Sequence, residues 1–157
     1  MGSLEEPAGL DRGRMAVRAG RVGKGKAFLC KASNCGTDIK LYIRAKMGFC
    51  NCTTGIADDA DLDRMGDLDL IAGQVAALGE GRPITVAHMK GRSRTYKIGA
   101  RNPLGKTAIS AAFNDRCDMV VATAILPNYG PDIVEPKVID FLNGQTVMRW
   151  AEVTLGL

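Results

Sequence analysis

Aromatic residues, histidine and long apolar runs are scarce in this sequence. It holds one Trp, three Tyr and four Phe among 157 residues, so its core must be built mainly from aliphatic side chains. No stretch approaches the roughly 18 uninterrupted apolar residues that a membrane-spanning helix needs, and we expect no membrane span. His88 is the only histidine, which excludes His-rich metal sites and any mechanism that requires two histidines.

The N-terminal stretch lacks the apolar segment that marks a signal peptide. We therefore expect either a cytosolic protein or the mature form of an exported one. The Cys-x-x-Cys spacing of a redox site is absent as well. The choice of compartment then depends on the state of the cysteines.

The size and composition indicate one ordinary globular domain. A chain of 157 residues is long enough to bury most of its apolar surface without covalent staples. Hydrophobic residues make up 46% of it and charged residues 24%, both ordinary for a soluble domain. Residues 1–13 show no hydrophobic periodicity, so we expect a flexible N-terminal arm followed by a single α+β domain over residues 14–157.

Alternating side chains predict a first β-hairpin. Between residues 39 and 47 every second residue is apolar, and the residues between them are charged or aromatic, which is typical of a half-buried strand. We expect this strand to pair with residues 26–33. The register that sets Ala32 opposite Ile39 gives every inward-facing residue an apolar partner.

Two more hairpins are expected further along the chain. In the first, residues 83–89 and 94–99 flank a turn at Lys-Gly-Arg-Ser. In the second, residues 107–113 pair with the apolar run Met119–Leu126. Because that run is continuously apolar, we expect a central strand that is covered on both faces.

The acidic middle of the chain carries the signals of a short helix. Thr54 or Asp58 can cap a helix that ends at Gly66, and the aspartates suit the positive N-terminal end of a helix. Residues 67–71 alternate and predict a short strand after it.

Two further helices are expected at the C-terminus. One starts at Pro136, since proline suits the first position of a helix, and the other is capped by Thr146. Strands followed by helices indicate the α+β class. The expected fold is an antiparallel sheet built from hairpins, with the short acidic helix and the two C-terminal helices packed on one face.

Four of the five cysteines cluster within 23 residues: Cys30, Cys35, Cys50 and Cys52. They could form disulfides, bind a zinc ion through four thiolates, or remain reduced in the core. Their spacing does not match the usual zinc knuckles, so we favour disulfides near the first hairpin, whose pairing the sequence leaves open. Disulfides would place the protein in an oxidising compartment, periplasmic or secreted. Cys117 is expected to be unpaired.

The charges of the chain lie in blocks. Residues 12–31 carry seven basic and no acidic residues, and residues 90–106 carry six and none, whereas residues 58–69 hold six aspartates and one arginine. The basic blocks could attract an anionic partner, or the blocks could offset one another in the fold. The candidate anion-binding surface consists of residues expected to face outward: Arg18, Lys40, Tyr42, Arg44, Lys46 and Arg94.

No complete catalytic constellation is present in the sequence. Residues 99–107, GARNPLGKT, differ from a phosphate-binding loop because five residues separate the two glycines, so we expect a connection between strands. We therefore expect a small non-enzymatic exported domain, a binding or accessory module without a cofactor, whose partner is an anionic protein, ligand or nucleic acid. The alternative is a cytosolic, zinc-stabilised module that binds nucleic acid.

Overall fold

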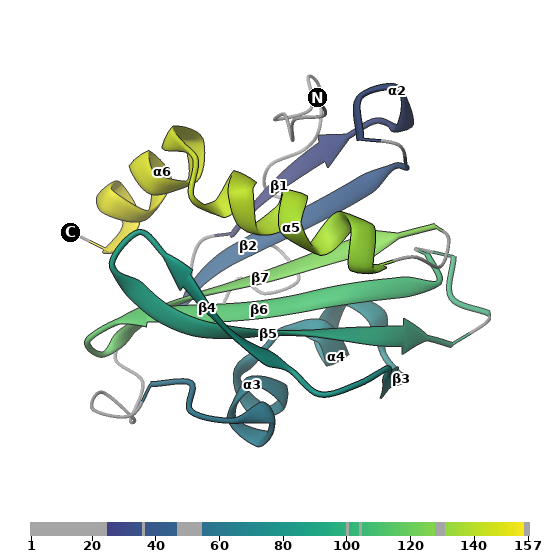
Figure 1. Ribbon diagram of the computed structural model, residues 1–157, viewed down its shortest axis with the longest axis horizontal. Coiled ribbons are helices and arrows are strands. Elements are labelled where there is room, and N and C mark those ends of the chain that lie inside the picture. Colours follow the sequence, from purple (N-terminus) through teal and green to yellow (C-terminus); the bar gives the residue numbers. More distant parts are fainter. Residues whose placement is uncertain are drawn as a thin grey trace.

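The computed structural model describes residues 25–35, 37–46, 55–99, 101–103, 105–127 and 131–155, without the side chains of residues 34, 35 and 131–133. Its centre is an antiparallel sheet of seven strands in the order β1-β2-β7-β6-β5-β3, with β4 also paired to β5 (Figure 1). The strands are β1 (Gly25–Cys30), β2 (Ile39–Lys46), β3 (Val75–Ala77), β4 (Arg82–Val86), β5 (Met89–Ile98), β6 (Thr107–Asp115) and β7 (Asp118–Leu126). The expected arm, residues 1–13, lies outside the described residues.

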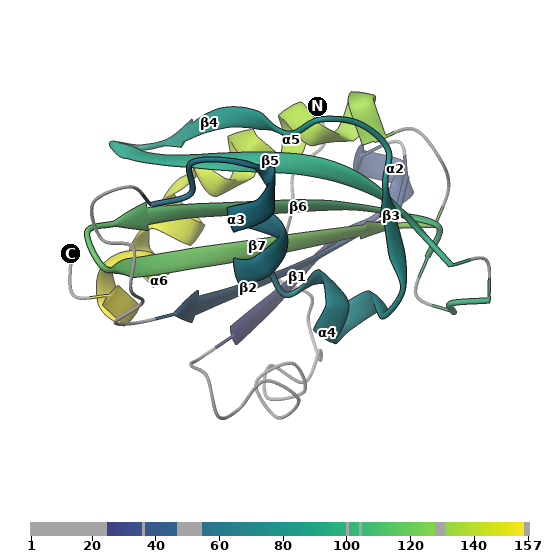
Figure 2. The same ribbon diagram turned by 90° about the horizontal axis from the view of Figure 1, so that it is seen from below.

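Helices cover both faces of this sheet. α5 (Pro131–Leu142) and α6 (Gln145–Leu155) lie on one face, and α3 (Asp59–Met65) and α4 (Leu68–Ala72) lie on the other (Figure 2). A short helix, α2 (Ala32–Cys35), connects β1 to β2. The α+β class is confirmed, but the acidic helix does not share a face with the C-terminal helices. None of the helices in the described parts of the chain is long and apolar enough to cross a membrane.

The larger core lies between the sheet and the C-terminal helices. Alternate residues of β2, including Ile39, Leu41 and Ile43, are fully buried there, as their spacing predicts. The rings of Phe28 and Phe141 meet edge to face, with centroids 5.0 Å apart. Fully burying one such aliphatic side chain contributes roughly 1.5–3 kcal/mol, so this face supplies most of the driving force for folding.

The register of the first hairpin differs from the expected one by two residues. Cys30, not Ala32, lies opposite Ile39. The chain leaves the strand after Cys30 and forms α2 before β2 begins. Because the shift is an even number of residues, the same side chains still face the core.

The turn of the second hairpin lies earlier than expected. Ala87 and His88 form it, with Ala87 at φ 54°, and the Lys-Gly-Arg-Ser segment lies inside β5. Gly91 serves a close approach between strands, because a Cβ there would overlap the carbonyl oxygen of Ala112 and come within 2.7 Å of Phe113 Cβ.

Two helix boundaries also differ from expectation. Residues 67–71 lie mostly in α4, whose buried residues Leu68 and Ala72 are four apart, a helical spacing that the alternation obscured. α5 begins at Pro131 and contains Pro136, whose exposed ring is accommodated on the solvent side. By contrast, all residues of the run Met119–Leu126 are buried, as expected for a central strand.

Candidate functional site

The face of the sheet under α3 and α4 carries one polar row between two small apolar clusters, with cations toward its sides. Four cations project from it: Arg44 and Lys46 from β2, and Arg92 and Arg94 from β5. One row across four strands is polar throughout: Arg94, Ser110, Thr123 and Tyr42. The acidic segment of the chain lies on this face (Figure 2).

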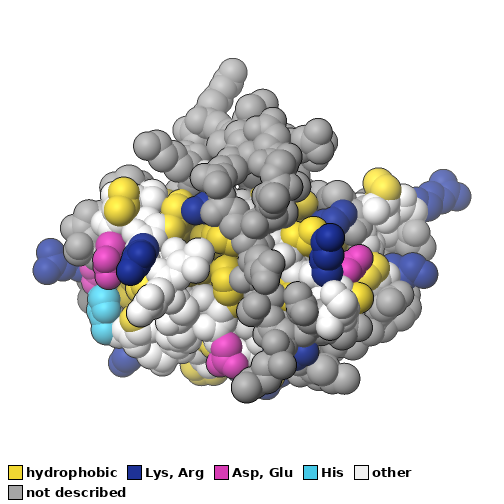
Figure 3. Space-filling model, turned by 90° about the horizontal axis from the view of Figure 1, so that it is seen from above, with side chains coloured by type: hydrophobic (Ala, Val, Ile, Leu, Met, Phe, Trp, Pro, Cys, Tyr) yellow, Lys and Arg dark blue, Asp and Glu magenta, His cyan; other side chains and the backbone are white. Residues whose placement is uncertain are grey.

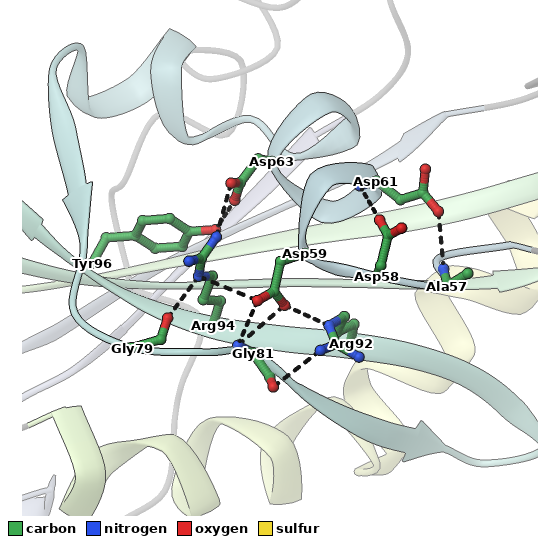
Figure 4. A network of polar contacts seen from close by, with 10 residues as sticks. All are labelled: Ala57, Asp58, Asp59, Asp61, Asp63, Gly79, Gly81, Arg92, Arg94 and Tyr96. Carbon is green, nitrogen blue, oxygen red and sulfur yellow. Dashed lines mark hydrogen bonds and ion pairs between the residues drawn. The ribbon is translucent and has the colours of Figure 1, made fainter.

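α3 forms because two aspartates cap its first turn. The Asp61 N–H donates to Asp58 Oδ1 at 2.8 Å, and the Ala57 N–H donates to Asp61 Oδ2 at 3.1 Å. With these groups satisfied locally, Asp59 and Asp63 extend toward β5 from the same side of the helix (Figure 4).

Asp59 joins α3 to β5 and to the chain before β4. Its Oδ1 accepts from Arg92 Nε at 2.6 Å, and the Gly81 N–H donates to both of its oxygens at 3.1 Å. Arg94 Nε lies 3.8 Å from Asp59 Oδ2. Arg92 also donates to the Gly81 carbonyl at 3.2 Å, which closes the network around the carboxylate (Figure 4).

Asp63 makes the second set of contacts between α3 and β5. Its Oδ2 accepts from Arg94 Nη1 at 2.9 Å, and its Oδ1 accepts from the Tyr96 hydroxyl. Arg94 Nε donates to the Gly79 carbonyl at 2.8 Å, and its guanidinium lies 5.7 Å from the centre of the Tyr96 ring. Arg94 is therefore held by an anion, a carbonyl and a ring at once.

These contacts shift the pKa values of two groups in opposite directions. The hydrogen bond from Arg92, helped by the Gly81 N–H, holds the pKa of the Asp59 carboxyl below its ordinary value of 3.8. Burial, followed by the hydrogen bond to Asp63, raises the pKa of Tyr96 above its ordinary value of 10. At pH 7 the carboxylate is ionised and the phenol is neutral.

Asp67 anchors the same acidic segment to β2. Arg44 Nε donates to Asp67 Oδ2 at 2.7 Å and Arg44 Nη2 donates to Asp67 Oδ1, and both side chains are almost fully buried. Lys46 Nζ lies 3.3 Å from Asp67 Oδ1 and donates to the Met65 carbonyl. The three aspartates that bind the sheet, Asp59, Asp63 and Asp67, are four residues apart.

The candidate anion-binding surface must be corrected at Arg44, which is 1% exposed and therefore not on the surface. Lys46 and Arg94 have side chains 18% exposed and are bonded to the acidic segment. Tyr42 is half-buried against the α4 cluster, and Lys40 is exposed. Arg18 lies outside the described residues. The residues of β2 that alternate away from the main core are not all exposed, because the layer formed by α3 and α4 covers that face of the sheet.

The cysteines are only partly described. Cys30 and Cys117 are disulfide-bonded, which corrects the expectation that Cys117 is unpaired. They lie at opposite ends of the sheet, Cys30 opposite Ile39 and Cys117 in the β6–β7 turn, so they do not pair with each other. The side chains of Cys35, Cys50 and Cys52 lie outside the described part of the chain, and the pairing stays a prediction.

A second group of cations lies at one end of the sheet. The end where β1 and β5 finish and β2 and β6 begin carries five exposed cations, Lys31, Lys40, Lys97, Arg101 and Lys106, which we call the basic end. Lysine and arginine side chains project from the end of the molecule where the β5–β6 connection lies, at the right in Figure 3. The sequence placed only Lys40 in the candidate surface. Lys97, Arg101 and Lys106 belong to the basic block of residues 90–106, and strand pairing brings Lys31 and Lys40 to the same end of the sheet.

Two motifs noted in the sequence have structural explanations. The described residues of the segment 99–107 lie between β5 and the start of β6, where Asn102 Nδ2 donates to the Ala72 carbonyl at 2.6 Å, and a strand rather than a helix follows. His88 is exposed in the β4–β5 turn, with Nε2 3.3 Å from Asp115 Oδ1. Neither has the geometry of a phosphate loop or a buried catalytic pair.

The polar groups under α3 hold the helix against β5. Asp59 is held ionised and the Tyr96 hydroxyl is held neutral, and each is bonded within the fold. Carboxylate and guanidinium groups that neutralise one another in this way position the elements that carry them. No family model, no curated protein and no solved structure matches this chain.

Proposed function

We propose that this chain is a small non-enzymatic binding or accessory domain that contacts an anionic partner through the basic end. In this proposal the hairpin-built sheet and the acidic helix serve as the scaffold. The observation that carries it is the separation of the cations into two groups. Those on the sheet face are neutralised by aspartates of the acidic segment, whereas those at the basic end are exposed.

Exposure is what allows these cations to act on a partner. A charge bonded to a carboxylate within the fold contributes little to the external field, while exposed like charges at one end add up and attract anions. The one described carboxylate at the start of β2, Asp38, accepts the Ala32 N–H at 2.8 Å. Asp38 keeps its charge, but five exposed cations outnumber it, so we expect a positive field at this end whose attraction weakens with salt.

The proposal also places the protein outside the reducing cytosol. Disulfides persist in exported and periplasmic proteins, and the bonded state of Cys30 and Cys117 supports that location. A cysteine in a disulfide supplies no thiolate to a metal, so we favour disulfides over the zinc-stabilised alternative.

Charge reversal at the basic end tests the proposal. We expect Lys40→Glu with Lys106→Glu to weaken retention on an immobilised polyanion, such as heparin or poly-L-glutamate, so that the protein elutes at markedly lower salt. The control variant, Lys90→Glu with Arg149→Glu, has the same net charge but alters exposed cations outside the basic end. Equal elution of the two variants would show that only net charge matters and would contradict the proposal.

A parallel column identifies the class of partner. Immobilised single-stranded oligonucleotide replaces the polyanion, with the same pair of variants. Retention on both columns, lost together in the Lys40/Lys106 variant, indicates a general anion-binding surface. Retention on the oligonucleotide alone would indicate a nucleic-acid partner.

A further inference from the structure

We infer that α3 is an internal cover over a second binding surface, which accepts an acidic helical segment of a partner protein when α3 is displaced. The surface consists of Arg92, Arg94 and Tyr96 on β5 together with Ser110 on β6 and Thr123 on β7. It is separate from the basic end, and the inference does not depend on the proposed function.

The covered surface contains a buried hydroxyl group to which α3 makes no hydrogen bond. Thr123 is 1% exposed, and its Oγ1 has no hydrogen-bond partner among the described residues. It lies opposite Ser110 in the row that also contains Arg94. Gly66 closes over this row, because a Cβ there would come within 2.9 Å of Ser110 Oγ. A buried hydroxyl without a partner is costly, so its presence under the cover points to a ligand that satisfies it.

The cover itself indicates the chemistry of the ligand. Asp59 and Asp63, one helical turn apart, present carboxylates to two arginines and a tyrosine hydroxyl. A partner helix with acidic residues four apart would make the same contacts. An apolar or a basic segment would not make these contacts. Either one would leave Arg92 and Arg94 without anions at a site where their side chains have low exposure.

α3 is held by these ionic contacts and by a small apolar contact with the sheet. Leu62 is its one fully buried side chain, and it packs in a small cluster with Ala112, Met119 and Val121. The C-terminal helices, in contrast, contribute many residues to the main core. Contacts between charged groups near the surface weaken with salt and yield to a competing anion, so α3 is the element that an acidic partner can displace.

The junctions of α3 allow this displacement without disturbing α4. Gly55 before it has φ 58°, and Gly66 directly follows it. Asp67 is bonded to the buried Arg44, so α4 stays anchored to β2 while α3 moves. The proposed motion is therefore confined to residues 56–66.

A peptide competition measures this directly. The probe is a synthetic peptide of residues 56–66 of this chain, which carries the acidic face of α3. In the full-length chain, D59N with D63N weakens the cover, and we expect this variant to bind the peptide at least tenfold more tightly than the wild type. D69N with D140N removes the same charge at exposed positions and should bind like the wild type. Adding Arg94→Met to the D59N/D63N variant should abolish binding.

Equal affinity of wild type and D59N/D63N for the peptide would overturn the inference. So would a stable dimer of that variant without peptide, because it would assign the surface to a second copy of the chain. If the variant fails to fold, hydrogen exchange of the wild type decides. In 1 M salt the amides of residues 59–66 should exchange at least tenfold faster while those of β6 and β7 stay protected, and unchanged exchange in α3 would refute the cover.

Discussion

Arg44 on β2 and Asp67 at the start of α4 form a two-pronged ion pair in the interior of the protein, with Arg44 Nε 2.7 Å from Asp67 Oδ2. Sequence alternation puts Arg44 on the outward face of its strand, where a cation would ordinarily meet water. The second layer of helices turns that face into an interior. The pair therefore joins the acidic segment to the centre of the sheet.

Removing one partner of this pair should be strongly destabilising. In Arg44→Met, Asp67 remains buried with only the partly exposed Lys46 nearby, and we expect a loss of about 3–5 kcal/mol in the free energy of unfolding. Chemical denaturation in urea measures it. Lys40→Met, an exposed change on the same strand, should cost under about 0.5 kcal/mol.

The double variant Arg44→Met with Asp67→Leu measures the energetic coupling between the two residues. It should recover much of the lost stability, because no uncompensated charge stays buried. If the double variant is as unstable as the two single variants combined, the two residues are not energetically coupled.

Gly91 should tolerate no side chain. A Cβ at this position would overlap the backbone of the neighbouring strand at Ala112, so Gly91→Ala forces β5 and β6 apart. We expect a loss of about 1–3 kcal/mol, the usual cost of overpacking, measured by thermal or urea unfolding. Gly79→Ala is the matched control, since nothing lies within 4 Å of its Cβ position. Equal effects of the two substitutions would contradict the close approach.

Tyr96 should ionise later than an ordinary tyrosine. Its pKa is raised above 10 in the folded state, so the folded protein holds the phenolic proton more tightly than the unfolded chain. The resulting stabilisation is complete below pH 10 and is lost as the pH rises above it. Absorbance at 295 nm, recorded as wild type minus Tyr96→Phe, should show this residue titrating above pH 10. A midpoint at or below pH 10 would contradict the raised pKa, and with it the effect of burial and of the Asp63 hydrogen bond on Tyr96.

The cysteines should resist alkylation until the protein is reduced. Because Cys30 and Cys117 are disulfide-bonded, we expect neither to react with iodoacetamide in the denatured, unreduced protein. Peptide mass mapping with and without reduction measures this and identifies the partners of both residues. Modification of either residue without reduction would show a free thiol. Zinc bound in the same sample would instead favour the metal alternative.

Much of the local structure could be predicted because its causes lie close together in the chain. The alternation of β2, the continuous apolar run of β7 and the cap of α3 at Asp58 each depend on residues a few positions apart. The start of α5 was predicted five residues too late, because Pro131 and Pro136 both suit the first position of a helix and the residues around them do not decide between the two. Residues 67–71 were ambiguous, since five residues fit both a strand and a helical period.

The candidate site was harder to predict, because its contacts span long distances in the chain. The pairs Asp59–Arg92 and Asp63–Arg94 join residues 33 and 31 positions apart, and Arg44–Asp67 spans 23. The sequence by itself determined that an acidic block and two basic blocks exist and which segments of the chain carry them. Only the tertiary structure decided which cations are neutralised and which are exposed, because a side chain's burial depends on what packs over its strand and not on its neighbours along it.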